Sequence, residues 1–275
     1  MIRFSRRQWI EIHDQPWCPV AVRDGATDCL KLFAVIGRQF DGAIDPLNAV
    51  LAETGDRYIV DLCAGGGGPW LGLHNRLDAG GAPPIVVLTD LFPNQAAMQQ
   101  AHQRTRGHIQ YVKRPVDAAA VSEDLPGLRT LFTAFHHFNP TAARAVLQDA
   151  VTASQSVAIF EQTRRSLFGL IFMLLLFPLA LLATPLLRPF RWSRLFWTYV
   201  IPAIPLVLLV DGIVSCLRTY TRSELQTMID SLDGPRYVWR YGRARTLLSP
   251  LGMSSLVGYP CARGGETGED GVGEV

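Results

Sequence analysis

The stretch Tyr58–Leu73, YIVDLCAGGGGPWLGL, places four consecutive glycines directly after a run that is typical of a buried β-strand. A parallel strand that turns sharply into a helix needs positive φ angles, which glycine adopts at little cost. The missing side chains also let a ligand approach the backbone amides at the start of that helix. A tight turn without a ligand would need only one glycine, so four in succession favour a binding loop.

The segments around this loop alternate between strand-like and helix-like patterns. Four further runs rich in β-branched and aromatic residues indicate strands at 83–90, 108–112, 128–135 and 155–162. Helix-like segments that open with proline lie between them. The alternation predicts an α/β fold with a Rossmann-like, seven-stranded, mostly parallel sheet and helices on both faces. The last two strands, at 236–246 and 253–260, would form a terminal β-hairpin.

The composition limits the classes of protein. The chain has 275 residues, of which 48% are hydrophobic and 18% are charged, so it is more apolar than a typical soluble domain. A formal net charge of +2 is too small to indicate a nucleic-acid partner. The five cysteines have no zinc-like spacing, which fits a reduced compartment and predicts no metal. The N-terminal residues lack the apolar run of a signal peptide, so we expect none.

An apolar insert interrupts the α/β pattern. About twenty residues from Leu167 to Leu187 carry no charge, and a second uncharged run extends from Leu195 to Val210. Arg188, Arg191 and Arg194 separate the two runs. The flanking strands share one sheet, which excludes a single membrane crossing. A shallow membrane hairpin, a helical pair lying in the interface, and an apolar surface buried in a homodimer remain, and the sequence favours the hairpin.

The glycine loop resembles motif I of the class I S-adenosylmethionine-dependent methyltransferases, acidic-x-Gly-x-Gly-x-Gly. IVDLCAGGGGP (59–69) matches it through Asp61, Gly65 and Gly67, with Cys63 where the first glycine is usual. Asp90, which ends VVLTD, is similar to the family's acid that bonds both ribose hydroxyls.

Later segments extend the resemblance. VKRPVDA (112–118) places Asp117 where the family often has an acid near the adenine amine, and LFTAFHHFNP (131–140) is similar to the fourth strand and its loop. The resemblance implies that S-adenosyl-L-methionine is the cofactor. It implies these cofactor-binding residues: Asp61, Ala64, Gly65, Gly67, Asp90, Leu91, Asp117, Ala118 and Phe135.

The candidate catalytic residue is His136, as a general base. We expect His136 and His137 to point in opposite directions on an extended strand end, and so not to chelate one ion. The candidate substrate contacts are Asp14, Trp17, Glu161, Arg218 and Tyr220. Trp17 could instead anchor a loop, and Asp211, Arg218 and Tyr220 could support the insert through an ion pair.

These observations predict a methyltransferase that acts on a small or lipophilic acceptor, at the cytoplasmic face of a membrane or in the cytoplasm. Two alternatives stay open: an NAD(P)-dependent oxidoreductase, which Trp70 disfavours because a small residue is usual there, and a non-catalytic membrane-associated module that binds the cofactor. The expected segments are an N-terminal helical cap (1–50), a methyltransferase domain (51–165 and 213–261), the apolar helical insert (166–212) and a disordered tail (262–275).

Overall fold

The computed structural model describes residues 4–246 and 249–261, so the predicted disordered tail lies outside the described residues. The chain divides into two compact units, each assembled from separate parts of the sequence. The helical unit comprises Met1–Gln39, Gln162–Thr221 and Arg245–Gly252. The sheet unit comprises Phe40–Glu161, Arg222–Ala244 and Met253–Val275.

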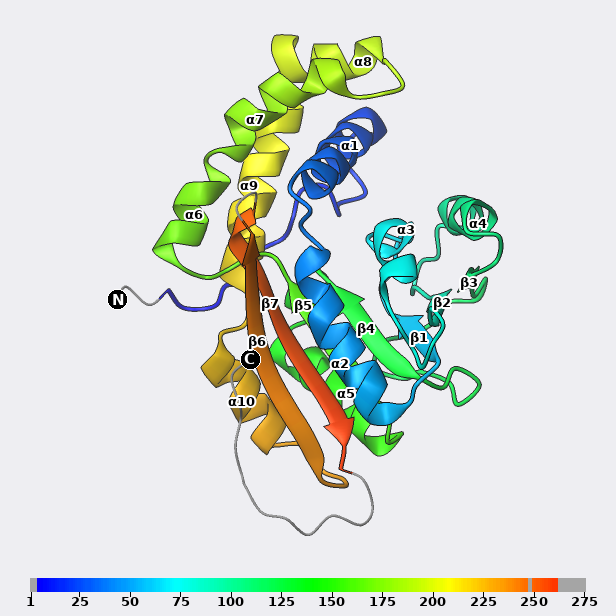
Figure 1. Ribbon diagram of the computed structural model, residues 1–275. Coiled ribbons are helices and arrows are strands. Elements are labelled where there is room, and N and C mark those ends of the chain that lie inside the picture. The colour runs from blue at the N-terminus through cyan, green and yellow to red at the C-terminus, as the bar shows by residue number, and fades with distance from the viewer. Residues whose placement is uncertain (1–3, 247–248, 262–275) are drawn as a thin grey trace. The chain divides into compact units, whose positions relative to one another are not determined.

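A seven-stranded sheet, in the order β3-β2-β1-β4-β5-β7-β6, forms the centre of the sheet unit (Figure 1), and the adjoining ends of its last two strands, within Arg245–Gly252, belong to the helical unit. The strands are β1 (Tyr58–Asp61), β2 (Ile85–Leu88), β3 (Ile109–Tyr111), β4 (Leu128–Phe132), β5 (Val157–Glu161), β6 (Tyr237–Thr246) and β7 (Ser249–Pro260). Strands β1 to β5 pair in parallel, and β7 pairs antiparallel with β5. The sheet is therefore mixed, whereas we expected a mostly parallel one. The difference arises at β7, which runs in the direction opposite to β5.

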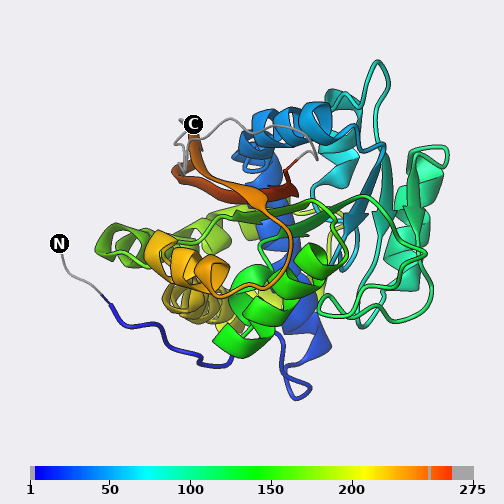
Figure 2. The same ribbon diagram turned by 90° about the horizontal axis from the view of Figure 1, so that it is seen from below.

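Helices cover both faces of this sheet, with α2 on one face and α5 and α10 on the other (Figure 2). The helices of the unit are α2 (Ile44–Thr54), α3 (Trp70–Leu73), α4 (Gln95–Arg104), α5 (Pro140–Thr152) and α10 (Arg222–Asp230). The side chains of Asn94 and Asn139 cap α4 and α5 by accepting hydrogen bonds from backbone amides of the first turn. Gly55 ends α2 with a φ of 71°, a conformation that glycine adopts without a steric penalty.

Aromatic packing fixes the part of the core that lies behind the glycine loop. Trp70 is fully buried, and its ring meets the edge of Phe132 at 5.4 Å between centroids. Phe132 stacks on Phe160 at 4.8 Å. Such pairs hold the side chains in one arrangement, so the loop is attached to a rigid base.

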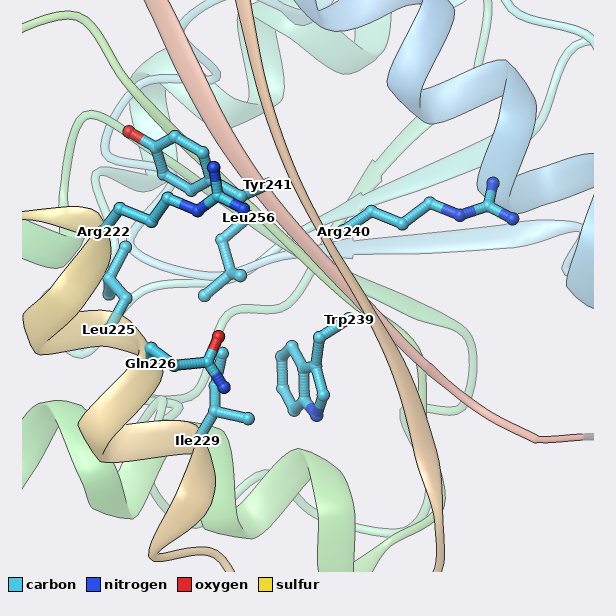
Figure 3. Close-up of a pocket in the computed structure, with 8 residues that line it drawn as sticks. All are labelled: Arg222, Leu225, Gln226, Ile229, Trp239, Arg240, Tyr241 and Leu256. Atoms are coloured by element: carbon cyan, nitrogen blue, oxygen red, sulfur yellow. The ribbon is translucent and has the colours of Figure 1, made fainter. Parts of the chain in front are cut away.

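Helix α10 packs against the end strands of the sheet, as Figure 3 shows. Leu225 and Ile229 of α10 face Trp239 of β6 and Leu256 of β7 (Figure 3). A cavity of about 10 Å³ remains between them, room for a single water molecule. This contact is therefore structural rather than a ligand site.

The helical unit contains the apolar insert and the N-terminal helix. Its helices are α1 (Val20–Ile36), α6 (Leu167–Met173), α7 (Leu176–Ala183), α8 (Trp192–Leu195) and α9 (Ala203–Arg218), with a π-helical turn (Phe196–Val200) before α9. Helices α1, α6 and α7 all pack against α9. A Cβ on Gly25 would lie 2.3 Å from Ile204 Cδ1, so a larger residue there would require the Ile204 side chain of α9 to shift. Helix α1 thus belongs with the insert.

Acidic residues of α1 pair with arginines of the insert. The buried Arg194 guanidinium contacts Asp28 at 2.5 Å, and Arg191 lies 3.6 Å from Asp24 one helical turn earlier. Two of the three arginines that separate the apolar runs are therefore neutralised within the unit.

The segment Leu167–Leu186 is long and apolar enough to cross a membrane, judged by length and composition alone. The helices Trp192–Val200 and Ala203–Arg218 are so only when taken together, and they meet at a bend of 71°.

Candidate functional site

The glycine loop connects the carboxyl end of β1 to α3. Cys63, Gly65, Gly67 and Gly68 have positive φ angles of 58°, 54°, 90° and 30°. A Cβ on Gly65 or Gly68 would meet no atom within 4 Å, whereas a Cβ on Gly67 would lie 3.0 Å from Leu88 Cδ1. Gly67 therefore serves close packing, and Gly65 and Gly68 leave open space beside bare backbone.

The helix that follows the loop is shorter than we expected. Helix α3 spans only Trp70–Leu73, and a 3₁₀ turn follows at His74–Arg76. Within the loop, the Gly67 amide donates to the Ala64 carbonyl at 2.8 Å. One helical turn has only a small dipole, so any ligand here would be held by the loop and by neighbouring side chains. Binding by the first amides of this helix stays a prediction.

Asp90 points toward the glycine loop from the end of β2. Its Oδ2 accepts a hydrogen bond from the Gly65 amide at 2.8 Å, and its Oδ1 accepts one from the Phe92 amide at 2.8 Å. The carboxylate is half-buried, and each oxygen keeps a further lone pair for another donor. Leu91 and Phe92 are exposed next to it and form an apolar edge.

Asp61 lies buried beneath the loop at the end of β1. Its Oδ1 accepts a hydrogen bond from the Thr130 hydroxyl at 2.7 Å. Burial raises the pKa of Asp61 to about 7; the hydrogen bond from Thr130 and the nearby Trp70 indole oppose this rise, and the charge of Asp90 adds to it. Asp61 is therefore poised to lose its proton when a positive charge arrives.

A third carboxylate makes the region strongly negative. Asp117 is exposed, and its Oδ1 accepts a hydrogen bond from the Ala119 amide at 2.9 Å, while Ala118 between them is buried. Burial, followed by the charges of Asp90, Asp61 and Asp117, raises the pKa of the Cys63 thiol to about 12. In the described part of the chain, none of the three carboxylates has a lysine or arginine partner. The arrangement favours a cationic ligand.

His136 and Glu161 form a buried pair at the ends of β4 and β5. The Glu161 carboxylate accepts a hydrogen bond from the His136 backbone amide at 2.9 Å and lies 2.8 Å from His136 Nδ1. A carboxylate only accepts, so we assign the ring proton to Nδ1, which makes Nε2 the basic nitrogen of the neutral ring. Phe135, the residue before this pair, is also buried.

The two histidines do not diverge as we predicted. Phe135–His137 forms a 3₁₀ turn rather than an extended strand end, and the rings of His136 and His137 lie side by side with centroids 4.3 Å apart. The expectation failed because the Asn139 cap and Pro140 begin α5 immediately afterwards, which requires the chain to turn here.

No protein-family model matches the sequence, and no curated protein matches it either. Among solved structures, magnesium protoporphyrin IX methyltransferase from Synechocystis with bound SAH is similar at 13% identity and a TM-score of 0.47, over 92% of this chain and 93% of that one. An O-methyltransferase from neocarzinostatin biosynthesis, in complex with S-adenosylmethionine and 2-hydroxy-5-methyl naphthoic acid, is similar at 14% identity and a TM-score of 0.45 over 88% of this chain. The chain spans 59% of that enzyme's length. Similarity this low does not transfer an activity, so the residues themselves must support the function.

The remaining substrate candidates lie in the helical unit. Arg218 Nη1 bonds the buried Glu11 carboxylate at 3.0 Å, and the Arg6 guanidinium lies 4.1 Å from the centre of the buried Tyr220 ring. Trp17 is 63% exposed, and Asp14 contacts His13 Nε2 at 3.3 Å. Their contact with a substrate stays a prediction.

Asp211 pairs with the N-terminal segment instead of with Arg218. It accepts hydrogen bonds from the Ile12 and His13 amides at 2.7 and 3.0 Å, and His13 Nδ1 lies 3.1 Å from it. The hydrogen bond to Asp211 raises the pKa of His13 against the opposing effect of burial. The polar residues of α9 therefore hold the N-terminal segment.

Sequence reasoning missed Thr130 and Glu11. Thr130 holds Asp61 across two paired strands, and the only sign of it in the sequence was a hydroxyl next to Arg129 in a short strand. Glu11 lies 207 positions from its partner Arg218, and nothing in its local sequence distinguishes it from a surface acid.

Proposed function

We propose that this protein is an S-adenosylmethionine-dependent methyltransferase that acts on a lipophilic acceptor at a membrane surface. The observation that carries the proposal is the acidic glycine loop: bare backbone at Gly65 and Gly68, with Asp61, Asp90 and Asp117 around it. When bound, S-adenosylmethionine supplies a methyl group on a cationic sulfonium.

The donor and acceptor groups fit this cofactor. Asp90 offers two carboxylate oxygens with spare lone pairs, which suit the ribose hydroxyls. Asp61 and the amides near Gly65 suit the charged amino-acid end, and Asp117 suits the adenine amine. The open space at Gly65 and Gly68 provides room for a ligand against the backbone.

The same charges disfavour the oxidoreductase alternative. A dinucleotide would bring two phosphate charges to the loop, where Asp90 already uses the Gly65 amide and three carboxylates raise the thiol pKa of Cys63. Like charges at this distance repel. The fully buried Trp70 also fills the place where a dinucleotide fold has a small residue.

His136 would act as the general base for an acceptor that must lose a proton. Glu161 holds its Nδ1–H and its backbone amide, which fixes the ring and leaves Nε2 basic. We therefore assign Glu161 a positioning role, in place of the direct substrate contact that we predicted. Methyl transfer itself depends mainly on alignment of the two reacting groups.

The apolar insert supports the lipophilic acceptor and the membrane surface. Large exposed apolar side chains recur along α6, α7 and the turns that adjoin them: Leu167, Phe168, Ile171, Leu174, Leu175, Leu179, Leu182 and Leu186. The bend of the insert exposes Arg188, Phe190 and Trp192, residue types that suit the headgroup region. We favour a shallow, reversible insertion of this face into one leaflet; a homodimer through the same face is the competing arrangement.

Two measurements test the proposal. Calorimetric titration with S-adenosylhomocysteine should show one saturable site, and titration with NAD should show none. Asp90→Asn should weaken the binding of S-adenosylhomocysteine by about tenfold or more. Asp124→Asn, which removes an exposed acid paired with Arg114, should leave this binding unchanged. Binding of NAD alone would contradict the proposal.

Catalysis is tested with S-adenosylmethionine that carries a tritiated methyl group, incubated with the protein and a lipid extract. Label should enter the organic phase and the transfer should fall with Asp90→Asn. Cofactor binding without label transfer to any lipid or aqueous extract would favour the non-catalytic module instead.

A further inference from the structure

A second hollow, separate from the glycine loop, lies at the amino ends of β2 and β3. It has a volume of about 570 Å³ and is lined by residues from α3, from the turn after it, and from the segments that precede β2 and β3. Strands β1, β2 and β3 are parallel, and the glycine loop follows the carboxyl end of β1. The hollow, which we term the basic groove, therefore lies at the amino ends of the parallel strands, whereas the glycine loop lies at their carboxyl ends.

The lining of the basic groove is positive. It includes Arg104, Arg106, His74 and His108, and none of its lining residues is acidic. Among the residues that the structure describes (4–246 and 249–261), no carboxylate forms an ion pair with the guanidinium group of Arg104 or of Arg106. Two arginines without a carboxylate partner that line one hollow create a local positive potential. Such a lining favours an anion.

A fixed turn presents these side chains. Arg106 and Gly107 have φ angles of 52° and 89°. The Ile109 amide donates to the buried Thr105 hydroxyl at 3.0 Å, and the His108 amide donates to the Thr105 carbonyl at 3.2 Å. The backbone between α4 and β3 is thus held at both ends, so little order has to be gained on binding.

The opposite wall combines a polar group with apolar surface. His74 is buried and its Nδ1 lies 2.9 Å from the Trp70 carbonyl, so the proton is on Nδ1. Leu71 and Pro83 contribute exposed apolar surface, and Asn75 adds an amide. The volume is in the range of small-molecule sites. An anion that also carries a carbon skeleton matches this wall better than a bare ion does.

We propose that the basic groove binds the phosphate group of a phosphate ester, with Arg104 and Arg106 as the main ligands. Arginine suits this role because its planar fork donates two parallel hydrogen bonds to phosphate oxygens. Both a soluble phosphate ester and the headgroup of a phosphomonoester lipid present this group. The proposal does not depend on methyl transfer.

The test is a calorimetric titration of the full chain with glycerol 3-phosphate, in a phosphate-free buffer of low ionic strength. The wild type should show one saturable site. The double variant Arg104→Gln/Arg106→Gln should bind about tenfold or more weakly, as expected for lost charge-assisted hydrogen bonds. Arg236→Gln, which removes an exposed arginine outside the groove, is the matched control and should bind like the wild type. Affinity for S-adenosylhomocysteine, measured on every variant, reports whether the fold and the other site are intact.

Vesicles distinguish the two sources of the phosphate. If the double variant loses the extra binding that phosphatidic acid confers on phosphatidylcholine vesicles, the ligand is a lipid headgroup. If it loses only the binding of glycerol 3-phosphate, the ligand is a soluble ester. The proposal is overturned if the wild type shows no saturable binding to either probe, if the double variant binds both as the wild type does, or if Arg236→Gln weakens binding equally.

Discussion

Replacing Asp61 by asparagine should stabilise the fold and, at the same time, remove affinity for the cofactor. Asp61 is buried, and burial raises its pKa from 3.8 to about 7. Between these two values the folded protein binds more protons than the unfolded chain, so the stability contributed by this residue falls as pH rises through that window. Asparagine carries no charge and can still accept the hydrogen bond from Thr130.

The expected gain depends on pH. From the two pKa values and the linkage relation, Asp61 costs the folded state about 4 kcal/mol at pH 8, where the buried carboxyl is ionised. At pH 5.5 the cost is about 2 kcal/mol, because the carboxyl ionises in the unfolded chain but stays protonated in the folded one. Any penalty for placing an NH₂ group in the pocket is the same at both pH values and cancels in the difference. Asp61→Asn should therefore stabilise the protein by about 2 kcal/mol more at pH 8 than at pH 5.5.

Urea denaturation of the wild type and of Asp61→Asn at these two pH values, followed by circular dichroism, measures the difference. Calorimetry with S-adenosylhomocysteine should show affinity reduced by about tenfold or more for the variant. A variant that is equally destabilised at both pH values would refute the reasoning, because Asp61 would then have the same pKa in the folded and unfolded chain and only a structural role.

Three further predictions concern the loop, the insert and the histidine pair. Gly67→Ala should cost about 1–2 kcal/mol in urea denaturation because of its φ of 90° and the contact with Leu88, whereas Gly72→Ala, which has open space around it, should not destabilise; equal effects would contradict this account of the loop. Leu182→Glu, at a side chain 71% exposed, should lower flotation with lipid vesicles several-fold and leave affinity for S-adenosylhomocysteine unchanged; undiminished flotation would contradict the assigned membrane face. Glu161→Gln should lower kcat by roughly 100-fold with little change in the KM of the acceptor, and Glu161→Asp should recover part of the rate; an unchanged kcat would limit Glu161 to a structural role.

The sheet could be predicted from the sequence because each strand has a recognisable pattern in its own residues. β4 and β5 are rich in apolar and β-branched residues, and both are buried along their whole length even at Arg129, Thr130 and Glu161. The packing of α1 against the insert could not be predicted, because residues that contact each other there, such as Asp28 and Arg194, are 166 positions apart. Nothing in the spacing around Gly25 indicated that Ile204 would pack against it.

The candidate site divides in the same way. The glycines after one strand and the acid at the end of the next were assigned to one cofactor site, and Gly65 and Asp90 are joined by a hydrogen bond. The partners of buried charges were not predictable, because Thr130 reaches Asp61 from a neighbouring strand, and Glu161 reaches His136 from another. Local spacing identifies the elements that carry a site, whereas the sheet order decides which side chains face each other.

Hydrogen–deuterium exchange with and without S-adenosylhomocysteine tests most directly whether the glycine loop is the cofactor site. The account predicts that added ligand slows exchange of the backbone amides from Cys63 to Gly68 and beside Asp90 and Asp117, with little change in α6 and α7. Saturating ligand that leaves the exchange of the loop amides unchanged, or that protects only another part of the chain, would contradict it.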